Sequence, residues 1–380
     1  MRPWRRRSDR PTRDLLVRLA GSVLIGVAAV AVLILIDQRG LGRDYGSYDF
    51  SAYVGAADRL RRSAPLYPQL AADGYRLGDQ NLFLYPPPVA LLFLPALFLP
   101  FPLASALWGV ALTILAVVVA VALSRMVAPA RRPLAVGLTL AAPPLLWELA
   151  NGNLTLITLA LCIVAWRARA GVWRPAAALA LAAGLKLLAV PLLLPVAIVA
   201  SRKVILAILA IAVAVIVVTW PLLGAAWTDW ASLTVQLAAG PQTAGYNVVP
   251  EALRAGAGRA VLATLTLTVL VACGVLARGR RLHPRLAFGA ALAAGPYLSA
   301  FVFYPYVVFL LPVLIGLILT DTPPWARAAG VLAWILAAAQ ALDPSTAYPS
   351  ALAATILAVS AVIWIGARSS RPAATDAAAA

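Results

Sequence analysis

Long uninterrupted apolar runs dominate this chain from its first forty residues to its last thirty. The runs at 204–223 and 261–277, for example, contain no charged residue. A helix of that length can cross a hydrocarbon core of about 30 Å. Because the runs are continuous and do not alternate with polar residues, they do not fit the strands of an outer-membrane barrel. The pattern predicts an all-α fold, a polytopic transmembrane helical bundle.

About twelve spanning helices are expected, and the segment between residues 175 and 201 is the weakest because Pro191 and Pro195 interrupt it. The expected spans lie at about residues 14–36, 102–124, 133–149, 153–168, 175–189, 191–201, 203–222, 257–277, 285–300, 303–320, 325–341 and 349–367. Residues 14–367 then form a single membrane domain. A basic cytoplasmic segment, 1–13, precedes it, and an alanine-rich tail, 368–380, expected to be disordered and cytoplasmic, follows it.

Two stretches near the start of the domain are expected to form helices that do not span the membrane, the first along its surface and the second along the surface or re-entering the membrane. Residues 49–62 place apolar side chains at helical spacing on one face, with Asp49 at the expected N-cap. Residues 89–99 are apolar but too short to span, and they contain Pro95. The first outer loop, 37–87, therefore carries at least one interfacial helix, and a second large outer loop is expected at 223–256.

Composition and charge agree with a membrane protein and set its orientation. Apolar residues make up 63% of the chain and charged residues 12%, whereas soluble domains have about 45–50% and about 25%. This excludes a soluble enzyme, a disordered chain and a fibrous protein. The net charge of +17 does not indicate a nucleic-acid partner, because membrane topology explains it. An even number of spans puts both termini and most lysines and arginines on one side. The positive-inside rule makes that side the cytoplasm, so we expect a multi-pass plasma membrane protein whose acidic residues gather at the outer face.

Several function classes are excluded by residue types that the chain lacks. His283 is the single histidine, and Cys162 and Cys273 lie inside apolar runs, so no structural zinc cluster and no disulfide framework is expected. No phosphate-binding loop of the type used by ATP-driven pumps occurs. We therefore expect neither a metal nor another cofactor.

Asp49 and Lys186 are the leading candidates for chemistry, and each also has a structural interpretation. Asp49 could accept a proton from a sugar hydroxyl just above the bilayer, or it could simply cap a helix. Lys186 is the one lysine expected inside a span. An intramembrane cation is costly and often functional, so Lys186 could bind a lipid phosphate, or its ammonium could snorkel to the interface.

Further candidates lie near the outer turns. Glu148 and Asn153 flank a polar turn whose groups could bind sugar hydroxyls or simply form the turn. Trp227 could stack on a sugar ring or belong to the aromatic belt at the membrane interface, and the same alternatives hold for Tyr304.

The order of several short motifs resembles the GT-C superfamily of membrane glycosyltransferases, and more closely glycosyltransferase family 87, whose members are polyprenol-phosphate-mannose-dependent α-1,2-mannosyltransferases. The resemblance covers about residues 10–320. It is carried by Asp49-Phe50 with Tyr53, Leu66-Tyr67, Tyr85-Pro86-Pro87, Gly152-Asn153, and Gly184-Leu185-Lys186 ahead of Pro191.

The resemblance implies that Asp49 is the catalytic base and that Lys186 binds the donor phosphate, and our mechanistic hypothesis adds Arg61 and Arg62 to that phosphate site. The residues expected to bind the sugar or the acceptor are Tyr53, Tyr85, Glu148, Asn153, Trp227 and Tyr304. Two departures stand out. Asn153 and Thr155 replace the usual Gly-Gln-x-Asn side chains of the turn, and residues 294–311 lack the usual late His or Asp, with Tyr297, Tyr304 and Tyr306 as their polar aromatic residues.

The expected function is an inverting transfer of a sugar, by family default mannose, at the outer face of the membrane. The expected partners are a polyprenyl-phosphate sugar donor, a glycolipid or glycan acceptor such as a cell-envelope lipoglycan, and membrane lipids. Three alternatives stay open: a polyprenyl-phosphate arabinosyltransferase, a lipid or sugar flippase, and a non-catalytic scaffold of an envelope-synthesis complex.

Overall fold

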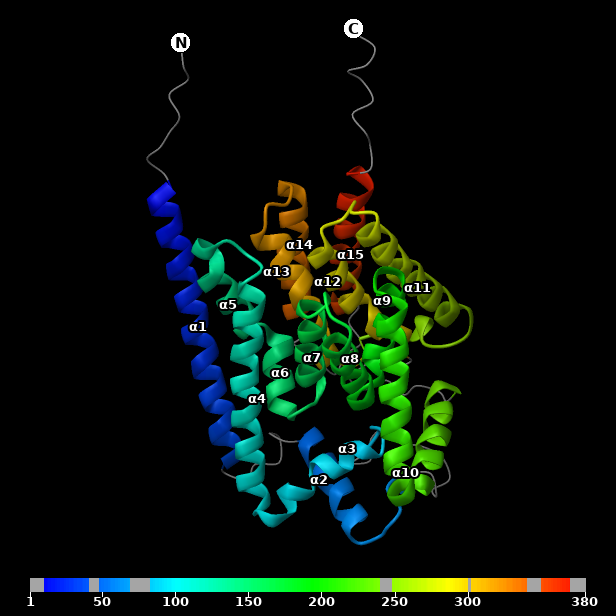
Figure 1. The fold of residues 1–380 in the computed structure, drawn as a ribbon. Coiled ribbons are helices and arrows are strands. Elements are labelled where there is room, and N and C mark those ends of the chain that lie inside the picture. Colours follow the sequence, from blue (N-terminus) through cyan, green and yellow to red (C-terminus); the bar gives the residue numbers. More distant parts are fainter. Residues whose placement is uncertain are drawn as a thin grey trace, which may run out of the picture.

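The described part of the chain is built from helices alone, as the sequence predicted. The computed structural model describes residues 10–40, 48–68, 83–239, 248–299, 302–339 and 350–369. The segments 1–9, 41–47, 69–82, 240–247, 300–301, 340–349 and 370–380 lie outside the described part. They include most of the expected basic terminus and tail and parts of both expected outer loops. Figure 1 shows the helices packed as one bundle.

The first half of the bundle consists of α1 (Arg10–Gly40), α2 (Tyr48–Arg61), α3 (Pro88–Leu92), η2 (Leu94–Phe98), α4 (Phe101–Ser124), η3 (Pro129–Arg131), α5 (Arg132–Leu140), α6 (Pro143–Asn151), α7 (Thr155–Arg167) and α8 (Trp173–Leu185). The second half consists of η4 (Leu187–Leu192), α9 (Leu193–Val199), α10 (Arg202–Ala239), η5 (Glu251–Leu253), α11 (Gly256–Arg278), α12 (Pro284–Ala294), η6 (Gly295–Leu298), η7 (Tyr304–Leu310), α13 (Leu311–Leu319), α14 (Pro324–Ala339) and α15 (Ser350–Arg368).

A helix occupies each of the twelve expected spans, but fewer than twelve are long enough to cross a membrane. Among the described residues, α1, α4, α10, α11 and α15 have the necessary length and apolar composition. The pair Pro129–Leu140 and Pro143–Asn151, whose two parts are bent by 49°, forms either a sixth, broken span or a re-entrant loop. The helices α7 and α8 have 13 residues each, so each extends only about 20 Å.

Prolines account for many of these interruptions. Pro143 and Pro144 occupy the first turn of α6, where their missing N–H groups cannot continue the helix from α5. Pro191 lies inside η4 and Pro296 near the start of η6, and both elements are short 3₁₀ helices. Helices that the hydropathy pattern presents as single spans are therefore broken into pieces.

The long helix α10 differs from the expected organisation at its far end. The sequence predicted a span over 203–222 followed by a loop over 223–256, whereas α10 continues from Arg202 to Ala239. Pro221 lies within the helix without ending it. The polar and aromatic residues after Pro221, which looked like an interfacial loop, are therefore helical.

The two elements expected at the membrane surface lie together at one end of the bundle. Residues 49–62 form α2, and residues 89–99 are divided between α3 and the short η2. The apolar face of α2, including Phe50, Tyr53 and Ala57, is buried against Tyr85 and Phe93. In Figure 1, α2 and α3 lie at the end opposite the first turn of α1 and the last turn of α15.

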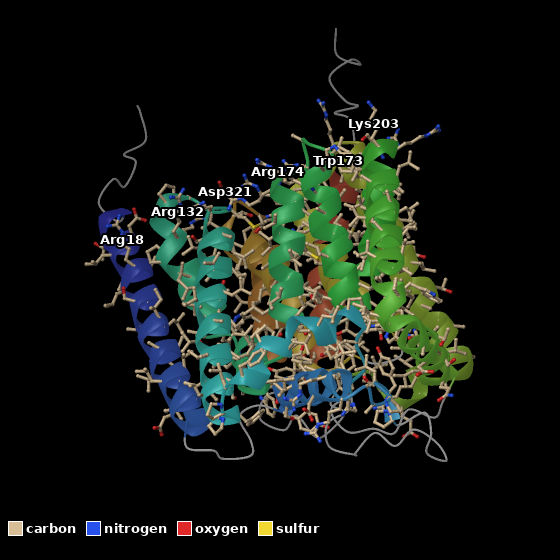
Figure 2. All side chains as sticks on the ribbon, turned by 60° about the horizontal axis from the view of Figure 1, so that its bottom comes forward. Arg18, Arg132, Trp173, Arg174, Lys203 and Asp321 are labelled. Atoms are coloured by element: carbon tan, nitrogen blue, oxygen red, sulfur yellow. The ribbon has the colours of Figure 1, made fainter. Side chains whose placement is uncertain are left out.

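Basic residues gather at that other end. Figure 2 shows Arg18, Arg132, Arg174 and Lys203 along the edge of the bundle from which α1 starts, so they lie far from α2. Four separate segments contribute these side chains, as the expected topology requires. The labelled basic side chains and α2 therefore lie at opposite ends of the bundle.

The crossing of α1 and α5 is tight enough to require glycine. A Cβ atom added at Gly21 would lie 2.5 Å from the carbonyl carbon of Pro133, and one added at Gly137 would lie 2.7 Å from the carbonyl oxygen of Gly21. Gly26, on the same helix as Gly21, has no atom within 4 Å of such a Cβ. Gly21 and Gly26 therefore form a matched pair for a packing test.

We expect Gly21→Ala to destabilise the protein by about 1–3 kcal/mol, because the added methyl group forces the two backbones apart. Gly26→Ala should be neutral or slightly stabilising, since alanine has the higher helix propensity. Thermal unfolding of the two variants in the same detergent measures the difference. Equal melting temperatures would show that the α1–α5 contact does not have this geometry.

Candidate active site

The turn between α6 and α7 brings the candidate residues together. Helix α6 ends at Asn151 and is capped by Gly152, whose φ of +69° lies in the left-handed region that favours glycine. A Cβ atom there would lie 3.2 Å from both Phe50 of α2 and Trp108 of α4. The indole nitrogen of Trp108 donates a hydrogen bond of 2.8 Å to the carbonyl of Gly152. The turn is therefore fixed against α2 and α4.

Asn153 uses both ends of its side-chain amide in this turn. Its Nδ2 donates to Oδ2 of Asp49 at 2.6 Å, and its Oδ1 accepts from Nζ of Lys186 at 2.7 Å. The backbone N–H and the hydroxyl of Thr155 also donate to Oδ1, at 3.0 Å and 2.8 Å. Because an ammonium can only donate, the amide oxygen must face Lys186 and the NH₂ group must face Asp49.

Lys186 is held by protein acceptors and does not snorkel to the interface. It follows the last residue of α8 in an extended conformation, and its side chain is buried, with a relative exposure of 6% for the residue. Its Nζ donates to Oδ1 of Asn153 and, at 2.8 Å, to Oγ1 of Thr155. The ring of Tyr306 lies 4.1 Å from Nζ and that of Tyr85 lies 5.4 Å away, within the range of cation–π attraction.

Asp49 lies in the first turn of α2, but it is not the cap that the sequence predicted. The helix begins one residue earlier, at Tyr48, and the Asp49 carboxylate turns towards Asn153. Its side chain is half-buried. Burial raises the pKa of Asp49 above its ordinary value, while the positive charge of Lys186 and the hydrogen bond from Asn153 oppose that rise without cancelling it.

Glu148 is fully buried behind this layer. Its Oε1 accepts a hydrogen bond of 2.7 Å from the backbone N–H of Leu156 in the first turn of α7, and its Oε2 has no hydrogen-bond partner. This position ties α6 to the start of α7 and adds a second carboxylate near Lys186. Because Glu148 is not accessible, the structure does not place it where a sugar could reach it.

Three tyrosines attach the segment before α3 to the same site. The hydroxyl of Tyr53 donates to the hydroxyl of Tyr85 at 2.8 Å, and the hydroxyl of Tyr67 donates to the carbonyl of Tyr85 at 2.6 Å. The indole of Trp230, in the unexpected extension of α10, donates to the carbonyl of Leu84 at 3.3 Å. Tyr85 is thereby fixed between α2 and Lys186.

The remaining predicted residues do not join this cluster. Arg61 and Arg62 pair with Asp58 at 2.7 Å and 2.9 Å, with 57% and 68% of their side chains exposed. Both arginines lie about 18 Å from Asp49 along the axis of α2. Trp227 donates to Thr219 within α10, and Tyr304 is buried with its hydroxyl bonded to the carbonyl of Ala337.

Three residues of the site had received no role from the sequence. Thr155 and Tyr306 had been noted only as departures from the expected family pattern, and Trp108 had not been singled out. Trp108 lies inside an apolar run, so no local signal distinguishes it from a lipid-facing tryptophan. Tyr306 comes from the late segment that lacks histidine and aspartate, and it covers Lys186 with its ring.

An open apolar groove is lined by the segment that follows Lys186 in the chain. It has a volume of about 450 Å³ and is lined only by apolar residues: Val190, Pro191, Leu193, Leu194 and Ala197 from η4 and α9, Ile205, Ile208 and Leu209 from α10, Leu267 from α11, and Leu298 from η6. The element η4 leads directly from Lys186 into the groove. Its α10 residues follow closely after Lys203, which Figure 2 places at the basic end.

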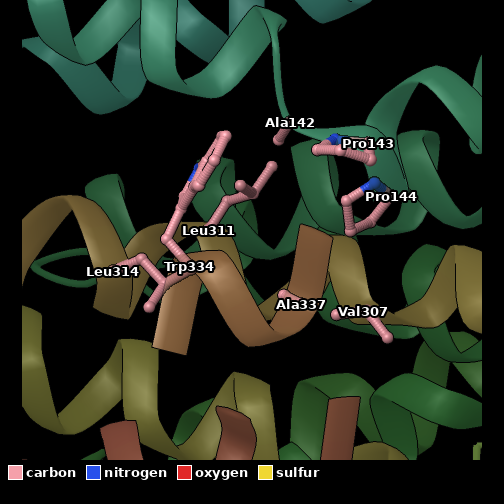
Figure 3. Close-up of a pocket in the computed structure, with 8 residues that line it drawn as sticks. All are labelled: Ala142, Pro143, Pro144, Val307, Leu311, Leu314, Trp334 and Ala337. Atoms are coloured by element: carbon pink, nitrogen blue, oxygen red, sulfur yellow. The ribbon is translucent and has the colours of Figure 1, made fainter. Parts of the chain in front are cut away.

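A second apolar pocket lies at the break between α5 and α6. Ala142, Pro143 and Pro144 line one side of it, and Trp334 and Ala337 of α14 line another (Figure 3). Its volume is about 10 Å³, which is no more than the space for one water molecule. This pocket therefore cannot hold a substrate.

The cluster is suited to proton transfer. A half-buried carboxylate lies one amide away from a buried ammonium, so the fixed positive charge stabilises the ionised form of Asp49, the form that can accept a proton. No group of three or more His, Cys, Asp or Glu side chains that could hold a metal ion occurs among the described residues.

Comparison with known proteins identifies the family. Searches of curated proteins and of solved structures find no match to the chain. Residues 83–305 match the family model described as glycosyltransferase family 87, a range that contains Tyr85, Glu148, Asn153 and Lys186 but begins after Asp49. The match covers more than half of the chain and confirms the resemblance carried by the motifs. The chain belongs to glycosyltransferase family 87 and is a membrane glycosyltransferase.

Proposed function

We propose that the protein transfers mannose from a polyprenyl-phosphate donor to a hydroxyl group of a glycolipid or glycan acceptor, with Asp49 as the general base. The observation that carries this proposal is the hydrogen bond between Asn153 and Asp49, which joins the first-loop aspartate to the part of the chain that matches the family. The acceptor is a component of the cell envelope, such as a lipoglycan.

The reaction is a single displacement at the anomeric carbon. Asp49 takes the proton from the acceptor hydroxyl, the hydroxyl oxygen forms a bond to the anomeric carbon, and the bond from that carbon to the phosphate oxygen breaks. The electron pair of the broken bond leaves with the polyprenyl phosphate. One displacement inverts the anomeric centre, so a β-linked donor gives an α-linked product.

The leaving group requires charge stabilisation more than protonation, because a phosphate leaves as a stable anion. The positive charge of the buried Lys186 side chain stabilises the negative charge that develops on the leaving phosphate. Arg61 and Arg62 are not included in the proposed phosphate site, since they lie at the far end of α2 and pair with Asp58.

A lipid-linked donor is supported by the apolar groove beside η4. A polyprenyl chain whose phosphate lies near Lys186 can enter the groove at Val190 and Pro191 and continue along α9 and α10 towards the membrane interior. The groove has the volume of an ordinary small-molecule site and lacks polar lining residues. A water-soluble nucleotide sugar would gain nothing from such a groove.

The location of the site follows from the distribution of charge. Asp49 lies on α2, at the end of the bundle opposite the labelled basic residues (Figures 1 and 2). We propose that the basic end, with both chain termini, faces the cytoplasm and that transfer takes place at the outer face of the plasma membrane.

We expect Asp49→Asn to reduce mannose transfer by about 10²–10⁴-fold, the usual contribution of a general base. The measurement is the transfer of labelled mannose from polyprenyl-phosphate mannose to a crude envelope glycolipid by purified protein. Asp58→Asn is the matched control, because Asp58 lies on the same helix and bonds only Arg61 and Arg62 in the described structure. It should retain nearly full activity.

Full activity of Asp49→Asn would remove Asp49 from the mechanism. Transfer from a polyprenyl-phosphate arabinose donor, without transfer from the mannose donor, would replace mannose and leave the rest of the proposal intact.

The pH dependence of transfer should show the raised pKa of Asp49. A general base acts when it is ionised, so kcat/KM falls as the pH decreases through the pKa of Asp49. The acid limb of the profile is the pH range in which kcat/KM falls on the acidic side. Because burial raises the pKa of Asp49, this limb should lie above the ordinary aspartate value of about 3.9. A pH–rate profile of the wild-type protein measures the limb, and a limb at or below the ordinary value would contradict the proposed environment of Asp49.

A further inference from the structure

We propose that Lys186 is a positioning residue that acts on Asp49 through Asn153 and does not bind the donor phosphate directly. This inference rests on the proposed role of Asp49 as the base. It assigns to Lys186, Asn153 and Thr155 one shared task, which is to orient the Asp49 carboxylate and to stabilise its ionised form.

The first argument is the set of partners that already surround the ammonium. An ammonium has three donors and no acceptor. Two of them are directed at Oδ1 of Asn153 and Oγ1 of Thr155, at 2.7 Å and 2.8 Å. The ring of Tyr306 covers Nζ at 4.1 Å, and the residue is 6% exposed. A phosphate could contact Nζ only if these buried contacts were rearranged.

The second argument is the orientation of the Asn153 amide. Lys186 and Thr155 both donate to Oδ1, so the NH₂ group is the end that remains for the Asp49 carboxylate. The reversed amide would place its oxygen against the carboxylate and its NH₂ group against the ammonium, two pairs that cannot hydrogen-bond. The bond of 2.6 Å to Asp49 therefore depends on the donors at the other end of the amide.

The third argument is the charge balance around Asp49. Glu148 of α6 and the tyrosines Tyr53, Tyr85 and Tyr306 face the network from the surrounding elements. Glu148 is an acid, and the tyrosines supply no positive charge. Lys186 is the cation that stabilises the Asp49 carboxylate against burial. Its removal would leave two buried or half-buried acids without a compensating charge.

The test is the pH–rate profile of Lys186→Met, which removes the charge and keeps an unbranched apolar side chain. We expect the acid limb of kcat/KM to move to higher pH, with about a tenfold loss at acidic pH for each pH unit that the limb moves. The KM for polyprenyl-phosphate mannose should stay within about threefold of wild type, a change worth less than 1 kcal/mol. A large rise in KM with an unmoved limb would show direct phosphate binding and overturn the inference.

Substitutions of two threonines test the same inference without removing a buried charge. Thr155 and Thr158 are both buried on α7, but the Thr158 hydroxyl bonds the backbone carbonyl of Leu154, whereas the Thr155 hydroxyl joins Lys186 to Asn153. Thr155→Val should move the limb in the same direction as Lys186→Met, Thr155→Ser should restore it, and Thr158→Val should leave it in place. Equal limbs for Thr155→Val and Thr158→Val would overturn the inference.

Asp49→Asn separates this inference from the proposed function. If Asp49→Asn transfers mannose normally, the proposed base is wrong and the inference fails with it. If Asp49→Asn is inactive while Lys186→Met changes only KM, the proposed function stands and the positioning role alone is wrong. If Lys186→Met is too inactive for a profile, the two threonine variants decide.

Discussion

The structure of the site depends on one constraint, the burial of the Lys186 ammonium in an otherwise apolar bundle. Removing an ammonium from water costs several kcal/mol unless other groups replace its hydration. Asn153 and Thr155 provide those groups, and the faces of Tyr306 and Tyr85 complete the surroundings. These residues can meet only if the α6–α7 turn, the end of α8 and the start of η7 lie at the same depth. The need to satisfy a single charge therefore sets where several helices must stop.

This requirement explains why so many helices are too short to span. Within the described chain, α6 ends at Asn151, α8 ends one residue before Lys186, and η7 begins two residues before Tyr306. Non-helical backbone at membrane depth is tolerated where protein surrounds it or where it lines a cavity, and broken helices in transporters place their ends around a binding site in the same way. Pro191 interrupts the helical segment that follows Lys186, and Pro143 and Pro144 separate α5 from the short α6 that leads to the turn. The fold thereby obtains polar turns inside the bundle and keeps α1, α4 and α11 as helices long enough to cross a membrane.

Hydropathy predicted the positions of the helices because membrane insertion is decided by local composition. The sequence placed α4 and α7 to within about two residues, and it selected Asp49, Asn153 and Lys186 individually. It did not predict their contact, because Asp49 and Asn153 are 104 residues apart, and Asn153 and Lys186 are 33 apart. Arg61 and Arg62 were assigned to the donor phosphate by charge alone, and helix geometry places them about 18 Å from Asp49 along α2. The extension of α10 was missed because tryptophan, threonine and aspartate at 227–230 are as typical of an interfacial loop as of a helix end.

The three charged side chains of the site differ in their exposure to solvent. Glu148 and Lys186 are buried, whereas Asp49 is half-buried on a helix that closes the end of the bundle. Asp49 is therefore the charge of the site that is partly open to solvent, while the compensating ammonium stays behind the Asn153 amide. An ammonium directly beside the carboxylate would form an ordinary ion pair, which lowers the basicity of the acid and occupies its oxygens. An amide between the two charges passes on part of the stabilisation and leaves the second carboxylate oxygen outside that bond, as the proposed role of Asp49 as a base requires.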